Sequence, residues 1–173
     1  MKALSVKANK IIIGAMRPED WNQVKQIYLD GIATGQATFE TEAPSWEAWD
    51  DSHLPLARLV AHSGNQIGGW AALSPVSKRQ AYAAVAEVSI YVAIDFRNQG
   101  VGHTLLESLI AESERHGIWT LQAIVFPENL ATLALHRGCG FRDVGRRERI
   151  GKLNGTWRDT ILLERRSSVV GID

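Results

Sequence analysis

The sequence predicts a mixed α/β fold on the strength of three observations. Strand-like and helix-like periods alternate in the order β-α-α-β-β-β-α-β-α-β-β, which implies about four helices. One strand–helix–strand step, from 85–93 through a long helix to 120–126, should form a right-handed crossover between parallel neighbours. Turn signals on both sides of that step predict antiparallel hairpins, so most of the sheet should be antiparallel around one parallel pair.

The N-terminal part predicts a strand followed by a helix. Residues 11–16 form an apolar run that ends at Arg17 and Pro18. Proline is tolerated at a first helical position, and the acidic residues that follow it are typical of a helix start. The apolar positions that then recur at helical spacing are Val24, Ile27, Tyr28 and Ile32.

A loop and a short helix come next. Residues 34–39 are mostly small and polar, and they carry one aromatic side chain, Phe39. We expect this loop at the lip of a substrate site. Residues 44–45 open a short helix whose Trp46 and Trp49 are expected to anchor the core or an interface.

Two strand-like runs, 58–62 and 67–73, flank the polar residues 63–66 and predict a hairpin. A loop at 74–83 then leads into the apolar, β-branched strand at 85–93. We therefore expect three consecutive strands before the long helix.

The long helix begins after a polar turn and ends at Gly117, which follows a cationic last turn. Its apolar positions are Val101, Leu105, Leu106, Leu109 and Ile110. Residues 120–126 predict the next strand, and Pro127 prevents its simple continuation.

The C-terminal part predicts a helix and a hairpin. Asn129 is placed to cap a helix, and strands are expected at 141–150 and 156–163. The Asn154–Gly155 pair between them is the strongest short hairpin signal available. Residues 167–173 are expected to form a loose tail.

Composition favours one globular domain over 1–173, with its core at about 11–164, because 173 residues suffice for one full core. Lys plus Arg and Asp plus Glu balance at 19 each, which disfavours nucleic acid or an anionic membrane as partners. The lysines near the N-terminus, Lys2, Lys7 and Lys10, precede an apolar run too short for a signal peptide or a membrane span, so we expect a cytoplasmic protein. Cys139 is the single cysteine, so no internal disulfide can form, and we expect it as a small buried side chain.

The turn at 97–104 is the most informative stretch. It joins a strand to a helix, so it is a helix N-terminus, and Gly100 and Gly102 let its backbone approach a ligand closely. Free amides and the helix dipole at such a turn favour phosphate. A tight turn that merely needs glycine is the structural alternative.

The pattern Arg97-x-x-Gly100-x-Gly102 resembles the Arg/Gln-x-x-Gly-x-Gly/Ala motif of the GCN5-related N-acetyltransferase superfamily. This resemblance implies a fold in which the two parallel strands splay apart around acetyl-CoA, with its pyrophosphate on the turn. The cofactor-binding residues that it implies are Tyr91, Val92, Arg97, Asn98, Gln99, Gly100, Val101, Gly102, His103, Thr104 and Asn129.

A second motif, from Asn129 through His136 to Phe141, has the spacing of the superfamily's Asn-x-x-Ala/Ser…Tyr…Gly-Phe helix. Asparagine suits the pantetheine arm because it can both donate and accept hydrogen bonds. His136 stands where many members carry a tyrosine that acts as general acid. Histidine can act as that acid or can simply contact the cofactor, and both readings remain open.

The sequence is more narrowly similar to the branch that acetylates phosphinothricin, methionine sulfoximine, methionine sulfone and arsinothricin. The matching stretches are 86–92, 79–82 and His136, and the similarity covers nearly all of 11–164. It implies transfer of acetyl from acetyl-CoA to the α-amine of a small amino acid or analogue, without a metal, in a homodimer.

The implied mechanism is direct attack of the amine on the thioester. Glu87 is the expected base, directly or through water, although a salt-bridged structural carboxylate is the alternative. Val92 would offer its amide to the thioester carbonyl at a strand bulge, and His136 would serve the thiolate. The expected substrate-pocket residues are Thr38, Phe39, Ser74, Arg79 and Tyr82, with a solvent-facing Arg79 as the alternative.

Two other functions share the same cofactor site. One is acetylation of peptide N-termini or polyamines, and the other is a non-catalytic acetyl-CoA sensor. The presence of both Glu87 and His136 favours catalysis.

Overall fold

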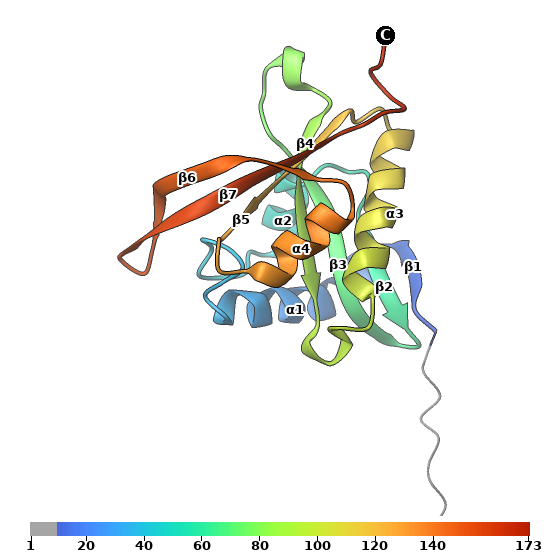
Figure 1. Ribbon diagram of the computed structural model, residues 1–173. Helices are drawn as coiled ribbons and strands as arrows, with labels where there is room; N and C mark the ends of the chain where they lie inside the picture. Colours follow the sequence, from blue (N-terminus) through green and yellow to red (C-terminus); the bar gives the residue numbers. More distant parts are fainter. Residues whose placement is uncertain (1–9) are drawn as a thin grey trace, which may run out of the picture.

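The computed structural model describes residues 10–173, so Lys2 and Lys7 lie outside it (Figure 1). The strands are β1 Ile12–Ala15, β2 Leu59–Ser63, β3 Gln66–Pro75, β4 Val85–Val92, β5 Thr120–Val125, β6 Arg142–Leu153 and β7 Thr156–Arg166. The α-helices are α1 Trp21–Ala33, α2 Trp46–Ser52, α3 Val101–Arg115 and α4 Leu130–Gly138, and short 3₁₀ turns occupy Pro18–Asp20, Gln80–Tyr82 and Ile94–Phe96. The predicted fold class and element order are confirmed.

The strands form one seven-stranded sheet in the order β1-β2-β3-β4-β5-β7-β6. Every neighbouring pair is antiparallel except β4 and β5, which are parallel. The β6–β7 hairpin reaches past the rest of the sheet (Figure 1), and the side chains of β6 are almost all exposed. The mixed, mostly antiparallel sheet therefore matches the prediction.

The two parallel strands are paired only at their N-terminal ends. Residues 85–87 of β4 lie opposite residues 120–122 of β5, and the pairing stops there. Beyond this point the strands diverge, and backbone groups of both strands lose their partners across the gap. The expected splay is thus present, and it begins at Glu87 and Gln122.

Alternation along β4 divides its side chains between two cores. Val88, Ile90 and Val92 pack on the side of α3 and α4, against the larger cluster that contains Leu105 and Leu109. Tyr91 packs on the opposite side, against the cluster that α1 and α2 build. The sheet therefore separates two different environments at the splay.

The aromatic side chains of α2 belong to this second core. Trp49 is fully buried, stacks against Trp46 with ring centroids 5.6 Å apart, and meets Trp21 and Trp70. Ser45 caps the helix by accepting a hydrogen bond from the Ala48 amide. Of the expected tryptophan anchors, Trp49 is thus a core residue and not available to an interface.

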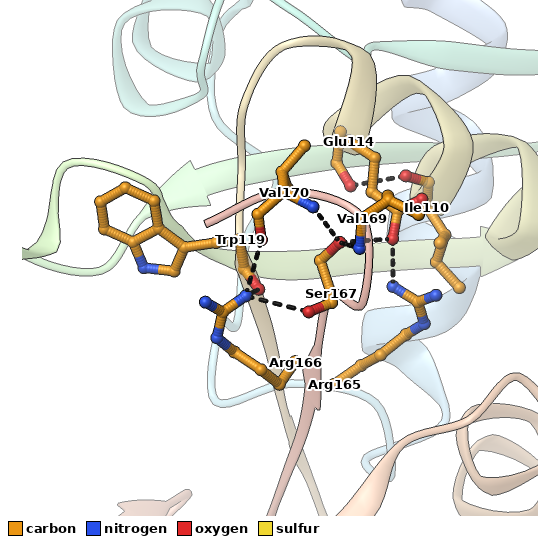
Figure 2. Close-up of polar contacts among 9 residues, drawn as sticks. Ile110, Glu114, Trp119, Arg165, Arg166, Ser167, Val169 and Val170 are labelled. Atoms are coloured by element: carbon orange, nitrogen blue, oxygen red, sulfur yellow. Dashed lines mark hydrogen bonds and ion pairs between the residues drawn. The ribbon is translucent and has the colours of Figure 1, made fainter. Parts of the chain in front are cut away.

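The C-terminal segment is clamped and not loose as predicted (Figure 2). Ser167 is buried, donates to Glu114 of α3 at 2.9 Å, and accepts hydrogen bonds from the amides of Val169 and Val170. Arg165 also donates to Glu114, at 2.8 Å. The end of β7 is therefore tied to the last turn of α3 through one carboxylate.

No helix of the described chain, residues 10–173, has the length and apolar character needed to cross a bilayer.

The Glu114 clamp predicts a pH-dependent contribution to stability. Burial raises the pKa of Glu114, but hydrogen bonds from Arg165 and Ser167 outweigh it and hold the pKa below the ordinary value of 4.5. A carboxyl group whose pKa is lower in the folded state stabilises the fold fully above the pKa that it has in the unfolded chain. This stabilisation is lost as the pH falls through the pKa that it has in the folded protein. Glu114→Gln should lower the free energy of unfolding by about 1–2 kcal/mol at neutral pH, and this difference should shrink below about pH 4.5. Urea denaturation at several pH values checks this, and a pH-independent difference would contradict it.

Candidate active site

A hollow of about 830 Å³ occupies the gap between the splayed ends of β4 and β5. We call it the splay hollow. Its walls come from β4, β5, α4, the loop at 34–40 and the turn before α3. The predicted site residues that line it are Thr38, Phe39, Glu87, Tyr91, Val92, Arg97, Asn98, Gly100, Val101, Gly102, His103, Asn129 and His136.

The turn before α3 is a helix N-terminus with free donors. Gly100 adopts the left-handed conformation, with φ of 80°, and precedes the helix. The first amide bonded within the helix is that of Thr104, which donates to the Gly100 carbonyl at 3.0 Å. The amides of Val101, Gly102 and His103 therefore have no intrahelical acceptor. Together with the positive end of the dipole, they form a site suited to phosphate.

The two glycines of this turn have different roles. A Cβ on Gly100 would meet nothing within 4 Å, so only its backbone conformation calls for glycine. A Cβ on Gly102 would lie 3.3 Å from Leu135 of α4 and 3.5 Å from Val92 of β4. Gly102 therefore lets α3 pack closely on its neighbours, in addition to lining the hollow.

Three other predicted cofactor residues brace the turn. Gln99 donates to the Asp95 carbonyl at 2.6 Å, and the Thr104 hydroxyl donates to the Gly100 carbonyl at 3.1 Å. Neither Gln99 nor Thr104 lines the splay hollow. Arg97 does line it, and its Nε donates to the Val92 carbonyl at 3.2 Å.

No bulge interrupts β4 at Val92, contrary to the prediction. The ladder between β3 and β4 keeps one register along its length, and the Ala93 amide donates to the Gly68 carbonyl at 2.9 Å. Because backbone groups alternate in an antiparallel ladder, the amides of Val88, Ile90 and Val92 point away from β3. The Val88 amide still faces β5 at the last ladder pair, Glu87–Gln122, whereas the splay, and not a bulge, frees the amides of Ile90 and Val92 toward the gap.

Glu87 lies where two hollows meet. A second hollow, of about 530 Å³, opens between α2, the loop at 38–44 and strands β3 and β4, and we call it the α2 hollow. Its lining residues are Tyr28, Thr38, Glu40, Glu42, Ala43, Pro44, Ala48, Trp49, Ser52, His53, Ser74, Glu87, Ser89 and Tyr91. Glu87 lines both hollows, so a group bound in one can meet a group bound in the other beside its carboxylate.

The Glu87 carboxylate is held by one neutral donor. Gln122, its cross-strand neighbour on β5, donates from Nε2 to Oε2 of Glu87 at 2.7 Å. Within residues 10–173 no basic side chain forms an ion pair with Glu87. The alternative that Glu87 is a structural carboxylate in a salt bridge is therefore not supported, because no cationic partner is present in residues 10–173. The other carboxylate oxygen, Oε1, is free to accept a proton.

The predicted substrate residues fall into two groups. Thr38 and Ser74 line the α2 hollow, and Phe39 lines the splay hollow, where it packs edge-on against Phe126 at 4.9 Å. Arg79 and Tyr82 line neither hollow. They lie on the exposed loop between β3 and β4, with the Arg79 guanidinium 5.7 Å from the Tyr82 ring. Their role in substrate binding remains a prediction.

His136 is buried in the wall of the splay hollow, with 1% of its surface exposed. Its Nδ1 lies 2.9 Å from the Thr132 carbonyl, which can only accept, so Nδ1 carries the proton. Burial lowers the pKa of His136 despite this hydrogen bond, which keeps the ring neutral at pH 7. Nε2 is therefore an acceptor, and it has no partner among the described residues.

Asn129 has its side chain already engaged. Its Oδ1 accepts from the Thr132 amide at 3.2 Å and caps α4, and its Nδ2 donates to the Gln36 carbonyl at 3.1 Å. Asn129 thus ties the loop at 34–40 to α4. Its predicted contact with pantetheine remains a prediction.

Sequence reasoning missed three polar residues of the site. Gln122 looked like one position of an apolar strand, and only the β4–β5 register shows that it faces Glu87. His53 and Glu40 line the α2 hollow, but neither stands in a recognisable motif. In residues 10–173 no group of three or more His, Cys, Asp or Glu side chains is arranged to hold a metal ion.

The chain is similar to a set of known acetyltransferases. A model of the acetyltransferase (GNAT) family matches residues 13–141. The chain is 33% identical over 165 residues to a phosphinothricin N-acetyltransferase of Alcaligenes faecalis, covering 88% of this chain and 81% of that protein. It is 25% identical to an L-methionine sulfoximine/L-methionine sulfone acetyltransferase of Pseudomonas aeruginosa, covering 80% and 84%. A phosphinothricin acetyltransferase of Sinorhizobium meliloti, solved in complex with acetyl-CoA, superposes with a TM-score of 0.85 at 26% identity, covering 94% of this chain and 91% of that one.

The turn before α3 predicts a charge-sensitive binding site for acetyl-CoA. Gly100→Asp places a carboxylate where the free amides face phosphate, so the dissociation constant for acetyl-CoA should rise at least about 10-fold. Titration calorimetry measures this.

Gly117→Asp is the matched control for that variant. Gly117 has φ of 77°, close to the 80° of Gly100, and also has nothing within 4 Å of its would-be Cβ, but it follows the opposite end of α3. It should cost similar backbone strain without weakening binding. Equal acetyl-CoA affinity in both folded variants would contradict the assignment of the turn.

Proposed function

The chain belongs to the acetyltransferase (GNAT) family and is an N-acetyltransferase, and from this we propose that it acetylates the α-amine of a small amino acid or amino-acid analogue with acetyl-CoA. The observation that carries the proposal is the position of Glu87, where the splay hollow meets the α2 hollow. The names of the relatives from Alcaligenes faecalis and Pseudomonas aeruginosa support phosphinothricin, methionine sulfoximine and methionine sulfone as the substrate class.

In this proposal the splay hollow takes acetyl-CoA. The free amides at the start of α3 and the nearby Arg97 bind its pyrophosphate. The pantetheine arm lies along the unpaired edge of β4, where the Val92 amide can bond to it as a further strand would. His136 and Thr160 line the same hollow, and their side-chain atoms Nε2 and Oγ1 are buried without a partner in the described chain. Buried polar atoms are normally paired, and an arm that carries amide groups offers partners for both.

The Ile90 amide suits the thioester carbonyl better than the Val92 amide that the sequence suggests. Val92 lies five residues from Glu87, or about 16 Å along an extended strand, whereas Ile90 lies three residues away, or about 10 Å. A shorter span can be filled by the substrate amine and one relay water. Ile90 therefore places the developing negative charge closer to the base.

Glu87 acts as the general base in this mechanism. It takes a proton from the substrate ammonium, directly or through the water, and the freed nitrogen lone pair attacks the thioester carbon. The C–N bond forms first and places negative charge on the carbonyl oxygen. Collapse of this adduct breaks the C–S bond, the electron pair leaves with sulfur as thiolate, and the remaining extra proton on nitrogen passes to that thiolate. Gln122 fixes the orientation of the carboxylate through Oε2 and leaves Oε1 for the proton.

His136 in its neutral state has no proton at Nε2 to give to the thiolate. At pH 7 we assign it the role of a hydrogen-bond acceptor for the bound cofactor. The role of general acid would require the imidazolium, which burial disfavours.

A second substrate class has support from the charges in the α2 hollow. Glu40, Glu42 and Glu87 line it, and no lysine or arginine does within residues 10–173. An amino-acid carboxylate would therefore need a cation from elsewhere, such as Arg79 on the adjoining loop. Diamines or simple amines need no such cation, which makes them the second candidate.

A panel of amines separates the two classes. The assay measures the thiol released from acetyl-CoA. The value of kcat/KM should be at least about 100-fold higher for phosphinothricin, methionine sulfoximine and methionine sulfone than for a diamine or a peptide N-terminus. A diamine that is turned over faster would favour the second candidate. No release with any amine, at intact acetyl-CoA binding, would contradict catalysis and favour a sensor.

Glu87→Gln should lower kcat by roughly 10²–10⁴-fold, because glutamine keeps the shape and the contact to Gln122 but cannot take a proton. Acetyl-CoA affinity should be retained. Steady-state kinetics with the best amine from the panel measures the effect, and calorimetry checks the affinity.

Glu148→Gln on the exposed face of β6 is the control for loss of a carboxylate. It should leave kcat unchanged. Near wild-type turnover of Glu87→Gln, or a loss of activity that tracks unfolding, would assign the proton transfer to water or another group.

We also propose that the protein is a homodimer. The support is the resemblance to the branch described above and the exposed apolar side chains on the projecting β6–β7 hairpin, including Val144, Ile150 and Trp157, each about 45% exposed. Light scattering at micromolar concentration should report about twice the 19.1 kDa chain mass, and Trp157→Glu should shift the population toward monomer. A wild-type monomer at that concentration would contradict the proposal.

A further inference from the structure

The α2 hollow contains a histidine that neither the motifs nor the proposed mechanism use. His53 follows the last turn of α2 and lines the hollow together with Glu87. Its ring stacks on Trp49, with centroids 4.1 Å apart and an angle of 19° between the planes. Trp49 is fully buried, so this contact fixes the plane in which the imidazole lies.

The hydrogen bonds of His53 determine which ring nitrogen carries the proton. Nδ1 lies 2.7 Å from the Trp49 carbonyl, which can only accept, so Nδ1 must donate. Ser52 Oγ donates to the same carbonyl and lies 3.0 Å from Nδ1. Nε2 is therefore the unprotonated nitrogen, and no side chain or backbone group of residues 10–173 forms a hydrogen bond with it.

The neutral form of His53 is also favoured by its surroundings. Burial lowers the pKa of His53, the hydrogen bond to Trp49 opposes this, and the nearby Arg58 guanidinium lowers it further. The Arg58 side chain is fixed beside the ring because it donates to the His53 carbonyl at 2.9 Å. His53 thus keeps a lone pair at Nε2 on a ring that lines the α2 hollow together with Glu87.

The charges around His53 decide what this lone pair can bind. The other ionisable side chains of the hollow are carboxylates and two tyrosines, and burial raises the pKa of both Tyr28 and Tyr91, which keeps these phenols neutral. A carbonyl, carboxylate or sulfonyl oxygen placed against His53 would meet an acceptor, whereas a donor such as an N–H group would find a partner. The hollow therefore suits a substrate with N–H donors on the part that faces α2.

We propose that His53 is a specificity-determining residue whose Nε2 accepts a hydrogen bond from an N–H group of the substrate, at a distance from the reacting amine. The inference rests on the proposed function and narrows its substrates to those that carry an N–H donor away from the reacting amine. Among amino-acid analogues, a sulfoximine carries the required N–H where the corresponding sulfone carries only oxygen. Among simple amines, the second amino group of a diamine provides the same donor.

Matched substrates test this directly. The wild-type kcat/KM should favour methionine sulfoximine over methionine sulfone by roughly 10-fold or more, because the sulfone leaves Nε2 facing an oxygen. A short diamine and its ω-methoxy monoamine analogue form the corresponding pair for the other class. His53→Phe keeps the stacked ring and removes the acceptor, so the selectivity in the sulfoximine–sulfone pair should fall to near unity, with acetyl-CoA affinity unchanged. In the diamine pair the selectivity should fall several-fold but not vanish, because Glu40, Glu42 and Glu87 still attract the second ammonium.

His116→Phe is the matched control. His116 also holds its Nδ1 against the carbonyl four residues earlier, at 2.9 Å from the Glu112 oxygen, but it lines neither hollow. It should leave the selectivity intact. A wild type without preference for the N–H substrate, or a folded His53→Phe whose selectivity equals that of the wild type, would overturn the inference. Absence of turnover with every amine would instead overturn the proposed function, and this inference with it.

Discussion

The interruption of pairing between β4 and β5 is the constraint on which the rest of the structure depends. The two strands form a parallel ladder only as far as Glu87 and Gln122 and then diverge. Beyond that point every second residue of β4 points its backbone groups into the gap without a partner on β5, a state that a buried strand avoids unless something else bonds to it. The hollow of about 830 Å³ in this gap is therefore a place where a bound chain can complete the sheet. Because Glu87 and Gln122 form the last pair, their side chains meet at the point where the gap begins.

The sheet divides the chemistry between its two faces. Alternation along β4 sends Ile90 and Val92 side chains into the core beneath α3, and Glu87, Ser89 and Tyr91 toward the hollow beside α2. The turn before α3, His136 and the free amides belong to the gap, whereas Glu40, Glu42 and His53 line the α2 hollow, which we propose as the substrate side. Cofactor and amine can thus approach the same backbone from different directions, with Glu87 at the boundary.

The sequence predicts the elements well because their boundaries depend on local chemistry. Asn129 caps its helix as expected, the short helix opens at Ser45, and Asn154–Gly155 forms the hairpin turn. It also predicts the divergence of the parallel strands, although only through a family resemblance. The pairing register of two strands and the protonated nitrogen of a histidine depend on contacts between distant segments, so local sequence patterns do not predict them. The pairing of Glu87 with Gln122, the absence of a bulge at Val92 and the Nδ1 protonation of His136 emerge only when distant segments are packed together.

A crystal structure of the protein with acetyl-CoA would test the central claim most directly, through the distance from the thioester carbonyl oxygen to the backbone amides of β4. The account predicts that this oxygen lies about 2.7–3.2 Å from the Ile90 amide nitrogen, with the pyrophosphate on the amides that begin α3. A thioester that lies outside the gap, or whose oxygen contacts no gap-facing amide of β4, would contradict the account.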